Sequence, residues 1–105
     1  MKSKILFVAF VLLIWGCKNE VVVTPNQIIL SGLLFTPDSM TVPLGSTVSW
    51  LNIESVTHTV TSDSAGFGSG NLSGNSTFNH TFTAKGTYKY HCSIHTMMSG
   101  KIIVQ

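Results

Sequence analysis

Alternating apolar and polar residues form short runs from residue 27 to the end of the chain, without a helical period. Val48 and Trp50 fall on one side of such a run, and Ser49 lies between them on the other side. Successive side chains of a strand point to opposite faces, so this alternation predicts β-strands. Gly, Pro, Asn, Asp and Ser separate the runs. The predicted strands are residues 27–31, 39–42, 47–52, 57–61, 77–83, 87–92 and 101–104.

Several short strands at close spacing favour an all-β sandwich or barrel. The chain has 105 residues, which suits one domain. Turn residues at 43–45 and 85–86 agree with strand ends at those positions. The Gly- and Ser-rich segment at 62–74 predicts a long loop over the surface.

The first sixteen residues have the composition of an export signal. Lys2 and Lys4 precede an apolar run at 5–15. This run is shorter than the roughly 20 residues that span a bilayer. Ile-Trp-Gly-Cys at 14–17 resembles a bacterial lipobox, which predicts a lipoprotein signal peptide at 1–16 and a lipid on Cys17. The alternative is an ordinary secretory signal that happens to end near a cysteine.

Without the signal peptide the chain would be a tethered domain of balanced charge. Residues 17–27 are the predicted lipid-anchored tether, and residues 28–105 are the predicted domain. Residues 17–105 contain four lysines, four acidic residues and no arginine, so nucleic-acid binding has no electrostatic support. We expect a protein of the periplasm or cell surface, anchored to a bacterial membrane.

A thiol, an imidazole and a thioether lie within seven residues, at Cys92, His95 and Met98. A second imidazole, His58, lies upstream in a separate predicted strand. Sulfur and imidazole suit copper in both oxidation states, and two His, one Cys and a weak axial Met define a blue-copper electron-transfer site. Cys92 ends a predicted strand, and Gly100 lets the chain turn into the last one. A short loop could therefore bring His95 and Met98 back to one metal.

These residues resemble the cupredoxins, and most closely their plastocyanin- and amicyanin-like members. The resemblance runs from about residue 33 to 104. Its main segments are Thr47-Val48-Ser49-Trp50-Leu51-Asn52, His58-Thr59-Val60 and Gly86-Thr87-Tyr88-Lys89-Tyr90-His91-Cys92. The spacing Cys92-x2-His95-x2-Met98 is similar to the short amicyanin loop. The resemblance implies a cupredoxin-type Greek-key β-sandwich of about seven to eight strands.

The resemblance also implies ligand roles and a function. His58, Cys92 and His95 would be the equatorial ligands of one copper ion, and Met98 would be the axial ligand. The protein would be a monomeric electron carrier and not an enzyme, cycling between Cu(I) and Cu(II). Its partners would be redox proteins of the periplasm or membrane, and electrons would leave through His95.

An apolar patch is expected around the exposed edge of His95. By the family topology, Leu33, Leu34 and Met97 would contribute to it, and it would suit the small interfaces of brief redox encounters. Met97 also competes with Met98 for the axial position. The family spacing favours Met98.

Two further histidines invite comparison with the copper ligands. His-Cys pairs such as His91-Cys92 bind a second copper in multicopper oxidases, but this chain lacks the His-x-His motifs of those enzymes. Strand alternation directs His91 away from the Cys92 face. His80 shares its parity with Phe78 and Phe82, which predicts a partly buried side chain and not a ligand.

The sequence departs from the family pattern near the expected ligands. Ile94 and Thr96 stand where relatives have proline, which predicts a less rigid loop. Thr59 follows His58 where many relatives have asparagine, and its side chain reaches less far.

Two other functions would use the same residues. A copper donor or buffer of the cell envelope would bind copper through the same ligands. An enzyme, such as a nitrite reductase fragment, would need more than one copper per chain. A reversible one-electron couple and an intense thiolate-to-copper colour would favour the electron carrier.

Overall fold

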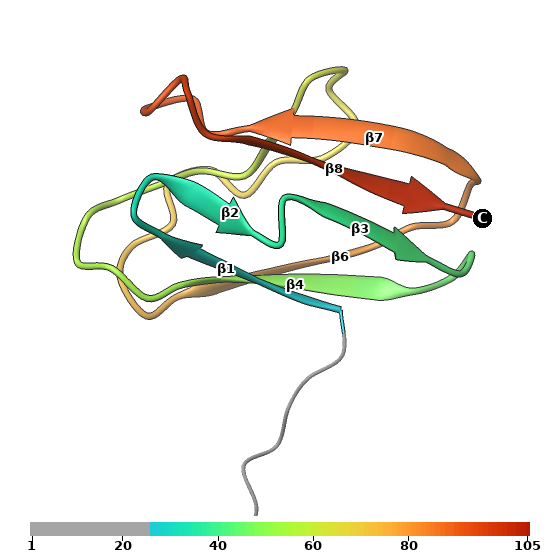
Figure 1. The fold of residues 1–105 in the computed structure, drawn as a ribbon, viewed down its shortest axis with the longest axis horizontal. Coiled ribbons are helices and arrows are strands. Elements are labelled where there is room, and N and C mark those ends of the chain that lie inside the picture. Colours follow the sequence, from blue (N-terminus) through green and yellow to red (C-terminus); the bar gives the residue numbers. More distant parts are fainter. Residues whose placement is uncertain (1–25) are drawn as a thin grey trace, which may run out of the picture.

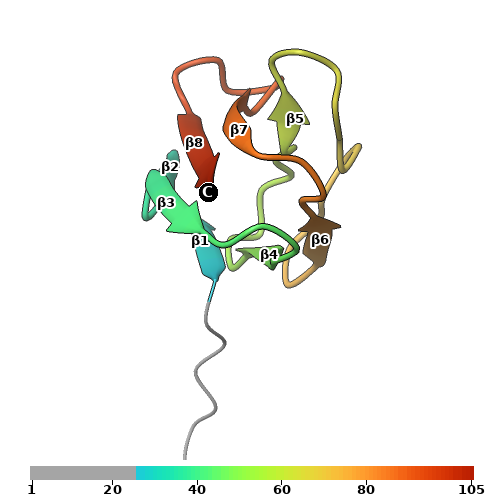
Figure 2. The same ribbon diagram turned by 90° about the vertical axis from the view of Figure 1, so that its right-hand side faces the viewer.

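The chain folds into a sandwich of two four-stranded sheets, described by a computed structural model for residues 26–105 (Figure 1). The first sheet has the order β2-β1-β4-β6 and the second has the order β3-β8-β7-β5. The strands are β1 (Gln27–Ser31), β2 (Leu34–Thr36), β3 (Ser39–Val42), β4 (Thr47–Asn52), β5 (Thr61–Ser62), β6 (Thr77–Thr81), β7 (Gly86–His91) and β8 (Ser99–Val104). Figure 2 shows the two layers end-on, with β7 and β8 above β1, β4 and β6.

Both sheets mix parallel and antiparallel pairs. β1 is parallel to β4 and antiparallel to β2, while β3 is parallel to β8 and β8 is antiparallel to β7. The chain crosses between the sheets several times, so strands that are distant in sequence end at the same edge of the sandwich. The all-β sandwich predicted from the sequence is confirmed.

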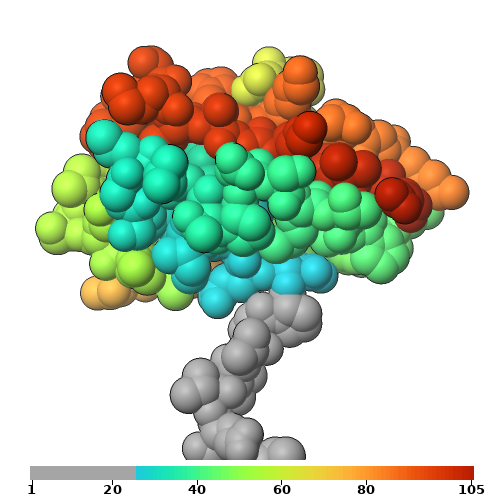
Figure 3. Space-filling view, viewed as in Figure 1, coloured from blue at the N-terminus to red at the C-terminus, as the bar shows by residue number. Residues whose placement is uncertain are grey.

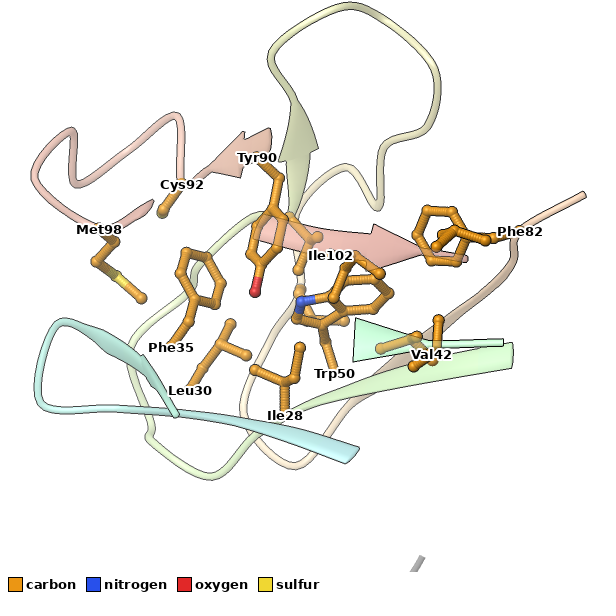
Figure 4. Close-up of a cluster of buried hydrophobic side chains, with 14 residues drawn as sticks. Ile28, Leu30, Phe35, Val42, Trp50, Phe82, Tyr90, Cys92, Met98 and Ile102 are labelled. Carbon is orange, nitrogen blue, oxygen red and sulfur yellow. The ribbon is translucent and has the colours of Figure 1, made fainter. Parts of the chain in front are cut away.

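The core lies between the two sheets and follows the predicted alternation. Val48 and Trp50 of β4 are fully buried, as is Tyr90 of β7. The rings of Trp50 and Tyr90 meet edge to face, with centroids 5.4 Å apart. In Figure 4 these two rings occupy the middle of the core, whereas Cys92 and Met98 lie together at one end of it. Cys92 and Met98, two of the four predicted copper ligands, are therefore part of the packed interior.

The structure adds one strand that the alternation pattern did not predict. β2 forms a hairpin with β1, in which Ser31 pairs with Leu34 across the two residues Gly32 and Leu33. Both turn residues have positive φ, 63° and 62° respectively. Two-residue hairpins of this kind usually carry Asn-Gly or Asp-Gly. Because a leucine stands at the second position, the sequence does not indicate this turn.

The predicted strand at 57–61 is wrong in its extent. Only β5, at Thr61–Ser62, pairs in the second sheet, where Thr61 faces His91. His58 instead makes an isolated antiparallel bridge with Leu72, which the loop 62–74 supplies. That loop is not purely superficial, because Leu72 is buried and Phe67 packs against the core. Other predicted strands differ from the observed ones only at their ends.

Three loops gather at one end of the sandwich. They are the β1–β2 turn, the segment that follows β4, and the loop between β7 and β8, all on the left in Figure 1. The space-filling view shows these cyan, yellow-green and red-orange surfaces side by side (Figure 3). The C-terminus lies at the opposite end. We call the first end the ligand end, because His58, Cys92 and His95 lie there.

The predicted signal peptide, the lipidation site Cys17 and the tether up to residue 25 lie outside the described residues. Within residues 26–105, no helix has the length and apolar character that crossing a membrane would require.

Candidate metal centre

Three side chains from two distant segments converge at the ligand end. One nitrogen each of His58 and His95 and the sulfur of Cys92 all lie within 4.8 Å of one another. The Cys92 Sγ atom is 3.9 Å from Nδ1 of His58 and 3.7 Å from Nδ1 of His95. The structure therefore brings together the three residues that were predicted as equatorial copper ligands. His58 and Cys92 are buried, and His95 is partly exposed.

Cys92 follows directly after β7 and is held by backbone amides. The amides of Thr59 and His95 each donate a hydrogen bond to Sγ, both at 3.4 Å. Burial by itself raises the pKa of the Cys92 thiol, but these amides and the nearby His58 outweigh burial and lower the pKa to about 6. At neutral pH the sulfur is therefore mainly a thiolate, which is the form that binds metals.

His58 is oriented by an acidic side chain four residues earlier. The Nε2 atom of His58 lies 2.7 Å from Oε1 of Glu54, and the second Glu54 oxygen accepts a hydrogen bond from the Gly32 amide at 2.8 Å. Since Nε2 serves the carboxylate, Nδ1 is left facing the Cys92 sulfur. The bond from Gly32 and the contact with His58 lower the pKa of Glu54. Burial lowers the pKa of His58, but Glu54 and Cys92 outweigh it and raise that pKa.

The segment between β4 and His58 is fixed by one buried amide side chain. The Nδ2 atom of Asn52 donates to the backbone oxygens of Val56 and Leu72, at 2.8 and 2.9 Å. Its Oδ1 atom accepts from the Glu54 amide at 2.9 Å. Asn52 thus sets the path of the chain that carries both Glu54 and His58.

The loop between β7 and β8 carries the remaining candidates and closes on itself. The Cys92 amide donates to the Met98 oxygen at 3.1 Å, and the Met98 amide donates to the His95 oxygen at 2.9 Å. The Met98 side chain is buried beside Cys92 at the end of the core (Figure 4), while Met97 is 73% exposed. The two neighbouring methionines therefore face different environments.

This set of donors fits copper better than a harder metal. A buried thiolate and two imidazoles, with a buried thioether nearby, offer the soft ligands that copper prefers in both oxidation states. A family model described as copper binding proteins, plastocyanin/azurin family, matches residues 22–105 of this chain. The chain belongs to this family.

Known relatives agree with that assignment. Amicyanin from Paracoccus denitrificans is 37% identical over 75 residues, which cover 67% of this chain and 56% of the amicyanin chain. This plastocyanin/azurin-family protein thus spans little more than half the length of that relative.

Solved structures agree as well. A reduced Cu(I) form of an amicyanin variant has a TM-score of 0.72 at 28% identity, covering 83% of this chain and 88% of the other. A purple cupredoxin from Nitrosopumilus maritimus has a TM-score of 0.67 at 34% identity, covering 75% of this chain and 98% of the other.

The family assignment confirms the predicted copper cofactor. It also agrees with the prediction of a cupredoxin and not an enzyme. Within residues 26–105, His58, Cys92, His95 and Met98 make one type 1 copper site. The lipid on Cys17 stays a prediction.

The two other histidines of this family member lie outside the cluster. His91 points to the outer face of β7, where its Nδ1 atom lies 2.6 Å from Oδ1 of Asp63. His80 stacks on Phe67 with ring centroids 4.7 Å apart, and burial lowers its pKa. Both observations agree with the placements predicted from strand alternation.

Sequence reasoning missed the residues that support the ligands. Glu54 and Asn52 also bond residues that are distant in sequence, Gly32 and Leu72, and no local pattern reveals those pairs. One available signal was the spacing of Glu54 and His58, four residues apart in a segment that is not helical.

Proposed function

We propose that this protein carries single electrons between redox proteins of the cell envelope. Copper, when bound, supplies the one-electron couple between Cu(I) and Cu(II). The observation that carries the proposal is the preformed donor set, in which a thiolate and two imidazole nitrogens already lie within 4.8 Å of one another. Ligands that are held in place by the fold move little between oxidation states, and a small rearrangement favours fast electron transfer.

Each ligand has a contact that holds it in place. Glu54 orients His58, and the amides of Thr59 and His95 hold the Cys92 sulfur. Met98 is fixed through its backbone and is buried. In this proposal His58, Cys92 and His95 are the strong ligands and Met98 is the weaker axial one.

The surface around His95 supports electron exchange by brief docking. His95 is the partly exposed member of the cluster, and six large apolar side chains that are at least 40% exposed belong to the ligand-end loops or, for Leu34, to the start of β2. They are Leu33, Leu34, Ile53, Val56, Ile94 and Met97. Exposed apolar side chains beside a partly exposed ligand suit the small interfaces of transient redox complexes. We therefore propose that the ring edge of His95 is where electrons enter and leave.

The proposed location is a bacterial membrane surface in the periplasm or on the cell exterior. It is supported by the apolar run at 5–15 and by Cys17 at the end of a lipobox-like segment. The partners would then be periplasmic or membrane-linked redox proteins, met by a monomer. A copper donor or buffer at the same place is the other candidate, since it would use the same ligands.

The deciding experiment is a visible and EPR spectrum of the copper-loaded protein, with metal counted per chain and a voltammogram recorded. We expect one copper, an intense thiolate-to-copper band and a reversible one-electron couple. Cys92→Ser should abolish the band and keep the β-rich far-UV spectrum, whereas His91→Gln, next to it but outside the cluster, should keep both. An unchanged band in Cys92→Ser would rule out the thiolate. A colourless Cu(I) protein that passes its metal to an acceptor would favour copper delivery.

A further inference from the structure

The segment that runs from Asn52 to the copper ligand His58 is hydrogen-bonded at both ends to the loop that precedes β6. At one end, the amides of His58 and Leu72 each donate to the other residue's carbonyl oxygen, at 3.1 and 2.8 Å. At the other end, the Asn52 amide donates to the Ser76 oxygen at 3.0 Å, and the Asn52 oxygen accepts from the Asn75 amide at 2.6 Å. The ligand segment therefore follows this loop from its first residue to its last.

Between these two ends, the backbone of the ligand segment lies where a side chain at Gly74 would stand. A Cβ atom added to Gly74 would lie 2.5 Å from the Glu54 carbonyl oxygen and 3.3 Å from the Ser55 Cα atom. The first of these distances is well inside the contact distance of two unbonded atoms. Both obstacles are backbone atoms, so no side-chain rotation could relieve the overlap.

The turn that contains Gly74 does not by itself require a glycine there. The Ser76 amide donates to the Ser73 oxygen at 3.1 Å, which closes a four-residue turn with Gly74 and Asn75 in the middle. Asn75 has the positive φ of this turn, 65°, whereas Gly74 does not have a positive φ. Other residues could therefore adopt the φ of Gly74. What Gly74 provides is the close approach of the two segments.

The residue that lies against Gly74 is the one that orients His58. The Glu54 carboxylate contacts Nε2 of His58 at 2.7 Å with one oxygen and accepts from the Gly32 amide at 2.8 Å with the other. Because the carboxylate is held from both sides, a shift of the Glu54 backbone would strain one of these two contacts. The Nδ1 atom of the same His58 ring faces the Cys92 sulfur, so the shift would reach the copper site.

We infer that Gly74 is a positioning residue of the copper site, which lets the ligand segment lie close enough to the loop for Glu54 to meet the His58 ring. Gly74 acts through the backbone of Glu54. This role concerns the copper site and does not depend on the electron-carrier function.

The test compares Gly74→Ala with Gly68→Ala, a matched control in the same connection between β5 and β6. Gly68 also lacks a positive φ, and a Cβ atom there would have its nearest contact, the Val60 oxygen, at 4.0 Å. Each variant adds one methyl group. The methyl group meets an ordinary contact at position 68 and overlaps with backbone at position 74, which forces the backbone to move.

Two measurements are informative. In the metal-free protein, the NMR signal of the proton between His58 Nε2 and Glu54 should shift in Gly74→Ala and stay unchanged in Gly68→Ala. The affinity for Cu(II), measured by competition with a chelator, should fall about tenfold in Gly74→Ala, because disturbing the group that orients a histidine ligand weakens metal binding by about this factor or more. Gly68→Ala should match the unmodified protein.

A double variant distinguishes positioning through Glu54 from a general loosening of the loop. Glu54→Ala removes the carboxylate and keeps the backbone that lies against Gly74. If Gly74 acts through Glu54, adding Gly74→Ala to Glu54→Ala should cause little further loss of Cu(II) affinity. A further loss of about tenfold would overturn the inference, because the loop would then act on the site without Glu54.

An unchanged His58 signal and unchanged Cu(II) affinity in Gly74→Ala would also overturn the inference, as would equal changes in Gly68→Ala. Should Gly74→Ala fail to fold, the unmodified protein decides. A nuclear Overhauser contact between the α protons of Gly74 and Ser55 supports the close approach, and its absence contradicts it. None of these readouts depends on electron transfer, so the inference and the proposed function can fail separately.

Discussion

Met97 and Met98 are neighbours with the same side chain, but the fold separates them by exposure. Met98 is 1% exposed and Met97 is 73% exposed. The difference arises because the Met98 backbone is tied to both Cys92 and His95, which turns its side chain into the core. Sequence spacing favoured Met98 as the axial ligand, and burial now gives that assignment a physical reason.

The two methionines can be distinguished by their effect on the reduction potential. Met98→Gln should lower it, because a harder oxygen ligand stabilises Cu(II) relative to Cu(I). A decrease of about 60 mV would correspond to a tenfold stronger preference for Cu(II). Met97→Gln is the matched control and should leave the potential nearly unchanged in cyclic voltammetry. A decrease in Met97→Gln alone would show that Met97 is the axial ligand.

The thiol of Cys92 should titrate well below its ordinary range in the metal-free protein. Burial raises its pKa, but the amides of His95 and Thr59 and the His58 ring outweigh burial, so the pKa falls from 9.0 to about 6. Because the folded pKa lies below the unfolded one, the thiolate's contribution to stability is complete above pH 9. It is lost as the pH falls through about 6.

This titration can be checked by measuring the ultraviolet absorbance of the thiolate as a function of pH, with Cys92→Ser as the blank. A midpoint near 9, the ordinary value, would show that the amides do not stabilise the thiolate.

At the scale of elements, local patterns predicted most of the strands but fewer of the connections between them. The alternation in β4 and β7 was strong enough to place Trp50 and Tyr90 in the core. The β1–β2 turn was missed because Leu33 occupies a left-handed conformation that leucine rarely adopts. The segment around His58 was taken for a strand of the sheet, because its bridge to Leu72 depends on a loop whose fold the sequence does not reveal.

The connection after β4 should depend strongly on Asn52. Asn52→Ala would leave the Val56 oxygen and the Glu54 amide without their side-chain partner, and the Leu72 oxygen with only the His58 amide, in a partly buried place. We expect the free energy of unfolding of the metal-free protein to fall by about 2–4 kcal/mol. Urea denaturation measures this change.

Asn79→Ala is the matched control for Asn52→Ala. Asn79 lies on the exposed face of β6 and makes one side-chain hydrogen bond, with Ser49 at 2.6 Å. Loss of this hydrogen bond should lower the free energy of unfolding by less than about 1 kcal/mol. Equal losses in the two variants would show that Asn52 has no special role in holding the His58 segment.

At the scale of the whole molecule, the sandwich topology assembles the site. The ligands come from two segments more than thirty residues apart, His58 beside the bridge to Leu72 and the loop after β7, and they meet because both segments end at the same edge. The motif predicted which residues bind metal, because ligand chemistry is local in sequence. It could not predict the support from Glu54 and Asn52, because their contacts with Gly32 and Leu72 exist only once distant segments have packed together.

The point at which the proposed lipid anchor joins the domain would determine which way the ligand end faces. β1 begins away from that end and runs toward it (Figure 1), so a tether would join the domain at a point away from His95. Residues 17–25 could span at most about 30 Å, so the proposed anchor would keep the domain close to the bilayer.

Cys17→Ala should therefore move the protein from the membrane fraction to the soluble fraction of the expressing cells, as measured by immunoblot. Cys92→Ser is the matched control, since it changes the other cysteine of the chain and should stay with the membrane. Retention of Cys17→Ala on the membrane would mean that the uncleaved apolar segment, and not a lipid, holds the protein there. The copper site would be untouched by that outcome, because its ligands all lie in the folded domain.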